Sequence, residues 1–412
     1  VAPRTTLERV VTFARGSLAE PVDTWVAYSA PLGASEGWSE PERSAFATEL
    51  RRVLEDEVRP AFVRYTDAIE QQILPHGRDA EHEGIASLPN GAACYAAEIR
   101  RHTTAVRSAD EIHQLGISEI ARTDARLLEL GGGRFASSTV AEVLEHLRSD
   151  PALGYTTGEE IIADAQARIR EAEARAPEFF TARATTACEV RPVPPSEAAS
   201  AGFAFYMPGT PDGSRAGVYY VNTAEPASRR RHLVAAVTAH EAVPGHHFQI
   251  TVAYALPAMP AFRRYAEFTA YVEGWGLYAE RLADEMGLYH DDLDRLGAID
   301  LEAFRAARLV VDTGLHTMGW SRAQAEAYLS EHTSMSADLI VNEVDRYINW
   351  PGQALAYKVG QLAILAARAQ AEEALGDRFD ARAFHDLVLG LGPVSLTVLD
   401  SAVREWIEAQ RA

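Results

Sequence analysis

Residues 240–249 read HEAVPGHHFQ, and the first eight of them carry three imidazoles and one carboxylate. Histidines and a glutamate at this density are typical of a zinc site with a general base beside it. The common zincin motif places its second histidine four residues after the first, on the same face of a helix. Here that position is Pro244, and the next histidine, His246, comes two residues later. The stretch therefore predicts a helix that is distorted at the proline.

His240 and His246 are the predicted metal ligands from this stretch. On a regular helix they would lie about 9 Å apart along the axis and about 240° apart around it. Zinc–nitrogen bonds are only about 2.0–2.1 Å long, so a regular helix cannot bring both rings to one ion. Pro244 lacks a backbone donor and Gly245 tolerates unusual backbone angles, which favours a widened turn here. His247, seven residues after His240, remains an alternative to His246 as the ligand.

The third ligand is expected from residues 266–280, which read AEFTAYVEGWGLYAE. Catalytic zinc sites of this kind use two histidines and one glutamate. Glu273 follows His246 by 27 residues, which leaves room for a turn and a returning helix, so we predict that Glu273 is the ligand. Glu280 shares its helical face and would orient a ligand histidine from the second shell. Glu267 is a weaker competitor for the ligand position.

Glu241 is the candidate general base, which would take a proton from water whose pKa the metal has lowered. Tyr357 is the candidate hydrogen-bond donor to the developing oxyanion. His316, which shares a helical face with Asp312, is a weaker candidate for the same role. Arg346 would hold a substrate carboxylate through two hydrogen bonds. Each group also has a structural alternative: helix caps and ion pairs for the His–Glu stretch, a buried His–Asp pair, and a core phenol.

The remaining sequence is mostly helical in pattern. Apolar residues recur at helical intervals over 40–74, where Pro60 is expected to kink or split the helix. A run of β-branched and aromatic residues predicts a short strand or hairpin near 217–222, at a sheet edge. Such a strand would either pair with an extended peptide or pack under a helix. Capping boxes predict helix starts at Ser108, Thr139, Thr157 and Ser321. Further helices are expected over 228–243, 246–256, 260–286, 298–315, 321–331, 337–349, 352–374 and 395–411.

We expect a mainly α protein with a single domain over residues 1–412. Residues 1–185 would form an N-terminal helical portion and one wall of a cleft, and residues 186–412 would carry the metal site. The formal net charge of −20 argues against a nucleic-acid partner. No run of about 18 apolar residues is present, so no membrane span is expected. The sequence does not predict an oligomeric state.

The N-terminal sequence and the cysteines bear on the cellular compartment of the protein. The N-terminal stretch VAPRTTLERV lacks a charged region followed by an apolar one, which predicts a cytoplasmic protein. Because the first residue is Val1, a missing N-terminal segment and an extracytoplasmic location are the alternative. The two cysteines, Cys94 and Cys188, have no neighbouring partner, which favours two thiols over a disulfide framework.

Six stretches of the chain resemble those of a known bacterial family. The stronger ones are HEAVPGHHFQ (240–249), YVEGWGLYAE (271–280), RLVVDTGLHTMGW (308–320) and EVDRYINWPGQALAYKVGQL (343–362), and the weaker ones are LPNGAACYAAEIRRHTT (88–104) and FHDLVLGLGP (384–393). Together they are similar to the family catalogued as domain of unknown function 885. That family resembles helical zinc metallopeptidases of the gluzincin type. The resemblance implies a large multi-helix zincin-like domain with a deep cleft, one Zn²⁺ ion and peptidase activity.

Three functional hypotheses follow. The first is a zinc-dependent metallopeptidase that hydrolyses oligopeptides by means of a glutamate-activated water. The second is a zinc hydrolase of a non-peptide amide or ester, since the same residues would serve it. The third is a metal-free binding protein with a degenerate site. Two imidazoles and one carboxylate also suit iron, cobalt or manganese, so zinc is preferred by ligand type alone.

Overall fold

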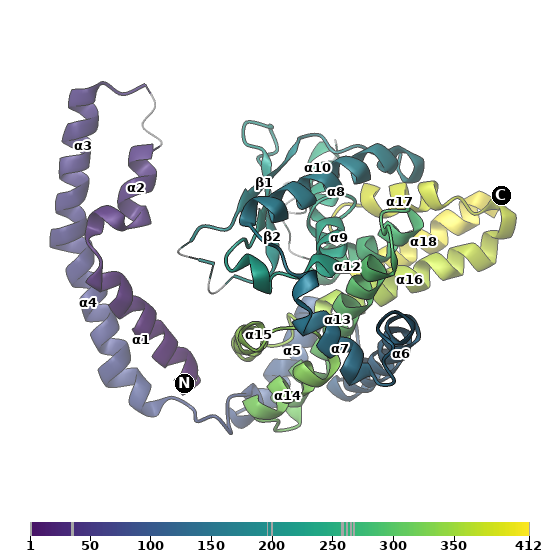
Figure 1. Cartoon of the computed structure of the whole chain (residues 1–412), viewed down its shortest axis with the longest axis horizontal. Helices are drawn as coiled ribbons and strands as arrows, with labels where there is room; N and C mark the ends of the chain where they lie inside the picture. The colour runs from purple at the N-terminus through teal and green to yellow at the C-terminus, as the bar shows by residue number, and fades with distance from the viewer. Residues whose placement is uncertain are drawn as a thin grey trace. The chain divides into compact units, whose positions relative to one another are not determined.

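The long helix α13 (Asp292–Thr317) lies at the centre of the larger part of the chain (Figure 1). Nearly all of its residues from Leu296 onward are buried, so it needs neighbours on every side. The helices α6 (Ala109–Phe135), α9 (Arg231–Glu241) and α16 (Leu355–Leu375) pack against it.

The computed structural model describes residues 2–33, 37–195, 197–198, 201–256, 259–260, 263, 266 and 268–411.

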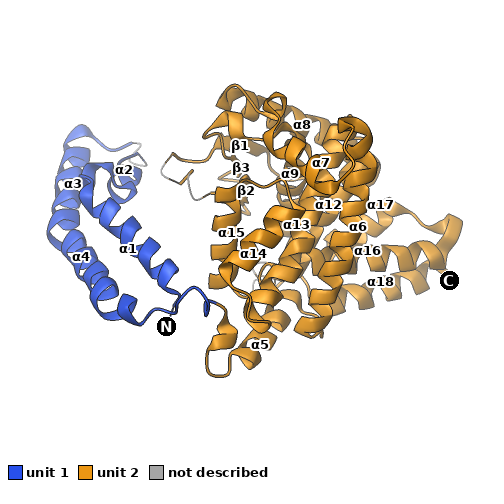
Figure 2. Cartoon of the chain, turned by 60° about the horizontal axis from the view of Figure 1, so that its bottom comes forward, with its two compact units in different colours: residues 1–83 blue, residues 84–412 orange. Residues whose placement is uncertain are grey.

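The chain divides into two compact units, Val1–Glu83 and Gly84–Ala412 (Figure 2). In the first unit, α1 (Arg4–Ala19) packs against α4 (Arg59–Ala68), and α2 (Val26–Gly33) against α3 (Glu40–Val53). A wider, π-helical turn over Leu54–Val58 separates α3 from α4. Pro60 lies in the first turn of α4, where a missing N–H group is harmless. The predicted split of the helical segment 40–74 is therefore confirmed.

The second unit contains the remaining helices and a small sheet. Its division from the first unit falls after residue 83. From the sequence we expect one domain over residues 1–412, in which residues 1–185 are only a helical portion. The division falls at residue 83 because the helices between there and residue 185 pack onto the later ones: α6 lies along α13, and α8 contacts α9. The other helices of this unit are α5 (Gly91–Thr103), α7 (Val140–Ser149), α8 (Gly158–Phe179), α10 (His246–Ala255), α12 (Thr269–Glu285), α14 (Arg322–His332), α15 (Ala337–Asn349), α17 (Ala381–Gly390) and α18 (Leu396–Arg411).

The predicted helix starts agree with the structure. Ser108, Thr139 and Ser321 each form a reciprocal capping box with the residue three positions on. Thr157 caps α8 by accepting from the Glu160 N–H group, but the Glu160 carboxylate accepts from the Thr156 N–H group instead. These signals are local, because a cap satisfies backbone donors within its own first turn. Of the helix expected over 260–286, α12 covers Thr269–Glu285, and most of residues 261–267 lie outside the described residues.

The strand predicted near 217–222 is present, but it is not an edge strand. β3 (Gly217–Val221) is the middle strand of a three-stranded sheet with the order β1-β3-β2. β1 (Cys188–Pro192) pairs with it in parallel, with Cys188 opposite Gly217, and β2 (Ala204–Met207) pairs antiparallel. The edge prediction was wrong because both partners come from the proline-rich segment before β3, where the local strand signal is weak. β3 therefore has no free edge for a peptide.

The fold is thus mainly helical with a small sheet, as the sequence predicts. Within the described ranges, none of the helices combines the length and the apolar character that crossing a membrane requires.

Candidate metal centre

The HEAVPGHH stretch forms a break between two helices rather than a widened turn within one. α9 ends at Glu241 and α10 begins at His246. The Phe248 N–H group donates to the Ala242 carbonyl (3.2 Å), which links the two helices across the break. The Trp275 indole N–H group of α12 donates to the Pro244 carbonyl (2.8 Å) and holds the connecting residues in place.

Gly245 is required by close packing inside this break. A β-carbon at this position would lie 1.9 Å from the His240 carbonyl oxygen and 2.4 Å from that of Ala239. Both contacts are with backbone atoms, which cannot rotate away, so only glycine fits. The sequence prediction of a distortion at Pro244 and Gly245 is right in position, and the form it takes is a complete interruption of the helix.

The break brings His240 and His246 together with Glu273 of α12. The Glu273 carboxylate lies 3.5 Å from His240 Nε2 and 3.3 Å from His246 Nε2. The two imidazole rings are nearly perpendicular, with centroids 4.6 Å apart. One potential ligand atom from each of the three residues lies within 4.8 Å of the others. These are the three residues that the sequence singles out as ligands.

The donor set and its two carboxylate–imidazole separations suit a tetrahedral zinc ion. Two ligand atoms bound to the same tetrahedral zinc at about 2.0–2.1 Å lie about 3.4 Å from each other. The carboxylate–imidazole separations of 3.5 and 3.3 Å are close to that value. They are longer than the roughly 2.9 Å of a direct N–H···O hydrogen bond. Two imidazoles and one carboxylate also leave a fourth position for a water or a substrate oxygen.

Glu280 follows Glu273 by seven residues on the same face of α12. It contacts His240 at Nδ1, the ring nitrogen that does not face Glu273. His240 Nδ1 donates to the Glu280 carboxylate (2.8 Å), which turns Nε2 towards Glu273. Arg305 of α13 lies 3.1 Å from the same carboxylate oxygen and balances its charge. Gly276 makes room for the ring, because a β-carbon there would lie 2.7 Å from its Cε1 and Nε2 atoms. Glu280 therefore orients a ligand histidine through a hydrogen bond, in the place that the sequence predicts.

These groups shift one another's pKa values. Burial alone would lower the pKa of His240, but interactions with the nearby Glu273 and Glu280 carboxylates outweigh it and raise the pKa to about 9. Burial would raise the pKa of Glu273, but interactions with the adjacent imidazoles of His246 and His240 hold it well below its usual range. Glu273 is therefore ionised. A divalent cation would compete with protons for the same imidazole lone pairs.

Glu241 follows directly after the first histidine and is the last residue of α9. Burial raises the pKa of its carboxyl group, while the neighbouring His240 and His246 lower it. A carboxyl group with a raised pKa beside a potential metal site is suited to accept and release a proton.

Tyr357 of α16 lies beside His240. Their rings are stacked at a centroid distance of 6.4 Å and an interplanar angle of 20°. The Arg308 guanidinium lies over the phenol ring, 4.3 Å from its centroid. Burial and the charge of Glu273 raise the pKa of Tyr357, and Arg346 and Arg308 act in the opposite direction. The phenol is therefore protonated near neutral pH and able to donate a hydrogen bond.

Arg346 lies near this phenol, but it is held by other groups. Its guanidinium bonds to the Glu343 carboxylate at 2.8 and 3.3 Å and to the Gln353 side chain. These bonds fix the position of the Arg346 side chain and occupy several of its N–H groups. A predicted role in binding a substrate carboxylate would use its remaining N–H groups.

Two histidines from the predicted set have structural roles instead. His247 accepts from the Tyr206 hydroxyl (2.9 Å) and donates to the Thr186 carbonyl (3.0 Å), and burial lowers its pKa to about 4. His316 accepts from the Ile85 N–H group (3.2 Å) and donates to the Tyr347 carbonyl (3.0 Å). Because both ring nitrogens of each are occupied, neither the alternative ligand His247 nor the oxyanion candidate His316 is retained.

The expected His–Asp pair is also absent from the described contacts of His316. Asp312 accepts instead from the Tyr95 hydroxyl (2.5 Å) and from the Gly352 N–H group (3.0 Å). Glu267, the weaker competitor for the ligand position, lies outside the described residues.

Sequence reasoning missed the residues that support the site from elsewhere in the chain. Arg305, Arg308 and Trp275 are such supports, and nothing in their local pattern distinguishes them from ordinary core residues. Gly276 could have been found, because it lies three residues after Glu273 on nearly the same helical face. A glycine at that point indicates that another group approaches the helix closely.

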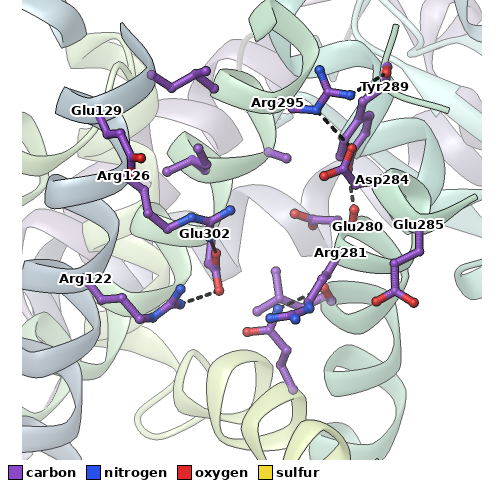
Figure 3. A pocket seen from close by; sticks show the side chains of 15 residues that line it. Arg122, Arg126, Glu129, Glu280, Arg281, Asp284, Glu285, Tyr289, Arg295 and Glu302 are labelled. Atoms are coloured by element: carbon purple, nitrogen blue, oxygen red, sulfur yellow. Dashed lines mark hydrogen bonds and ion pairs between the residues drawn. The ribbon is translucent and has the colours of Figure 1, made fainter. Parts of the chain in front are cut away.

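Two cavities are lined in part by residues of α12. A cavity of about 430 Å³ is lined by Glu273 together with residues of α10 and the start of the 350–353 turn. A larger, charged cavity of about 730 Å³ is lined by Glu280 and by residues of α6 and α13 (Figure 3). In it, Arg122 and Arg126 pair with Glu302 on one side, and Arg295 pairs with Asp284 on the other (Figure 3). Only the smaller cavity adjoins a candidate ligand.

Comparisons with known proteins place this chain in a family. The model of the family "Bacterial protein of unknown function (DUF885)" matches residues 1–403. A structure described as that of "the putative lipoprotein from Colwellia psychrerythraea" is 33% identical, with a TM-score of 0.95 over 99% of this chain and 71% of that chain. A "putative lipoprotein of unknown function from Shewanella oneidensis" is 17% identical, with a TM-score of 0.71 over 98% of this chain and 73% of that chain, and shows the fold alone. No curated protein is significantly similar. The match over residues 1–403 shows that the chain belongs to the bacterial family DUF885.

Proposed function

We propose that this protein is a zinc-dependent metallopeptidase that hydrolyses oligopeptides in a zincin-like cleft. The observation that carries the proposal is the convergence of His240, His246 and Glu273, with Glu241 next in sequence to the first ligand. The cavity of about 430 Å³ beside Glu273 supports it, because it offers space for part of a peptide next to the ligands.

The chemistry divides between the metal and the side chains. When bound, zinc would lower the pKa of a water molecule and polarise the scissile carbonyl. Glu241 would act as the general base and take a proton from the water molecule whose oxygen forms the new bond to the carbonyl carbon. The Tyr357 phenol donates a hydrogen bond to the oxygen on which negative charge develops. The C–N bond then breaks, and the proton held by Glu241 passes to the leaving amine.

The supporting residues keep this arrangement in place. Glu280 fixes the tautomer and direction of the His240 ring, and Arg305 lies 3.1 Å from the Glu280 carboxylate and holds it in place. The Arg308 guanidinium packs over Tyr357 and favours negative charge on or near the phenol oxygen.

A pair of variants tests the proposal. Glu241→Gln should retain one zinc per chain and lose peptide cleavage, whereas His240→Ala should lose both. Zinc is measured by elemental analysis of the purified protein, and cleavage by mass spectrometry of a mixed peptide library. Peptide cleavage that survives in Glu241→Gln would contradict the mechanism. Cleavage of small acyl amides or esters without cleavage of any peptide would support the alternative non-peptide hydrolase.

We also propose that the protein acts outside the cytoplasm, the second of the two locations that the sequence leaves open. The support is that the 33%-identical structure from Colwellia psychrerythraea is described as a lipoprotein. Fractionation of the native bacterium, followed by immunodetection of this chain, tests the proposal. Detection in the cytoplasmic fraction alone would contradict it.

A further inference from the structure

The cavity beside Glu273 has predominantly apolar walls. It lies among α10, α12 and the residues before α16, and its apolar lining includes Pro208, Ile250, Tyr254, Val272, Trp350 and Pro393. Its volume of about 430 Å³ falls in the range of small-molecule pockets. A large apolar side chain would be transferred from water to an apolar environment on entering it, which is favourable.

The cavity offers little to a charged side chain. Among the described residues that line it, Glu273 is the only one with a formal charge, and its carboxylate faces the two imidazoles. An acidic side chain would be repelled by Glu273. A basic side chain would be buried without a free partner, which costs free energy.

Gln249 of α10 gives the cavity one polar feature. Its side chain is almost fully buried, with 3% of its surface exposed, and it lines the cavity. Its Nε2 atom donates to the Tyr271 carbonyl at 3.5 Å. Its Oε1 atom is buried and has no hydrogen-bond partner among the described residues. A buried acceptor without a partner is unfavourable, and an N–H group from a ligand would satisfy it.

We infer that this cavity is the pocket that selects the substrate. It takes a large apolar or aromatic side chain, and Gln249 Oε1 accepts an N–H group of the same substrate residue. The inference rests on the proposed peptidase function, because it places this residue next to the bond that is cleaved. It goes beyond that function by naming the class of residue that is recognised.

Direct binding tests the inference without requiring turnover. N-acetyl-phenylalanine amide, N-acetyl-alanine amide and N-acetyl-aspartate amide are titrated into the purified protein by calorimetry, with the change in tryptophan fluorescence as a second signal. The phenylalanine probe should bind at least about tenfold more tightly than the alanine probe, and the aspartate probe most weakly. Equal affinity for the phenylalanine and alanine probes would overturn the inference.

Two variants identify the pocket. Gln249→Met keeps the side-chain length but removes the acceptor, and it should weaken the phenylalanine probe about five- to tenfold. Val272→Asp adds a second carboxylate to the wall and should shift the preference from N-acetyl-phenylalanine amide to N-acetyl-lysine amide. Val398→Asp, at an exposed position on α18, is the matched control and should bind as the wild type does. An unchanged affinity for the phenylalanine probe in Gln249→Met, together with an unchanged preference in Val272→Asp, would overturn the inference.

The two proposals fail in different ways. If the phenylalanine probe is preferred but no peptide is cleaved, the binding pocket stands and the peptidase function fails. If peptides are cleaved without preference for a large apolar residue on either side of the broken bond, the peptidase function stands and the pocket assignment fails.

Discussion

Replacing Glu280 by glutamine should weaken zinc binding while leaving the fold intact. Glu280 is 2% exposed, accepts from His240 Nδ1 at 2.8 Å and lies 3.1 Å from Arg305. Glutamine keeps the shape and one acceptor oxygen, but it removes the charge that makes His240 a stronger ligand and that balances Arg305. Loss of such an outer partner typically lowers metal affinity 10- to 100-fold. This corresponds to about 1.4–2.7 kcal/mol of binding free energy.

The affinity is measured by competition between the protein and a chromophoric zinc chelator near neutral pH. Glu285→Gln is the matched control, because Glu285 lies on the same helix but is more exposed and pairs with Arg368. Its zinc affinity should equal that of the wild type. Thermal unfolding of each metal-free protein separates loss of affinity from loss of folding. An unchanged zinc Kd in Glu280→Gln would refute the role assigned to this carboxylate.

Three further predictions follow from the packing and charges. Gly276→Ala should weaken zinc binding about tenfold with unchanged helix content by circular dichroism, because its β-carbon would lie 2.7 Å from the His240 ring. His247→Ala should lower the free energy of unfolding by about 2 kcal/mol or more in urea titrations and retain one zinc per chain. Lys358 and Arg122 outweigh burial and lower the pKa of Glu302 from 4.5 to about 2. Its ionised form therefore stabilises the fold above pH 4.5 by about 3 kcal/mol, which is lost as the pH falls towards 2, and Glu302→Gln should flatten this part of the urea-measured stability profile.

The parts of the fold that the sequence predicts are those with local causes. Ser108 and Ser321 begin helices because a capping box lies within four residues, and Pro60 lies in the first turn of α4 because its missing N–H group is harmless there. The position of β3 could not be predicted. Its middle place in the sheet depends on partners at 188–192 and 204–207, whose own strand signal is weak.

The candidate site divides in the same way. The spacing of His240 and His246 excludes a regular helix, and the seven-residue interval between Glu273 and Glu280 places both on one face, so these four residues could be found in the sequence. Arg305 could not, because its contact with Glu280 depends on how α13 packs against α12. His316 was assigned to the site because four-residue spacing to Asp312 suggested a pair. The structure instead binds each of them to backbone or phenol groups elsewhere.

The most direct test of the metal site is anomalous X-ray diffraction from crystals of the zinc-incubated protein, recorded on both sides of the zinc absorption edge. We predict one strong peak within about 2.0–2.2 Å of His240 Nε2, His246 Nε2 and a Glu273 carboxylate oxygen. No peak among these three residues, or a peak held by His247 instead, would contradict the account.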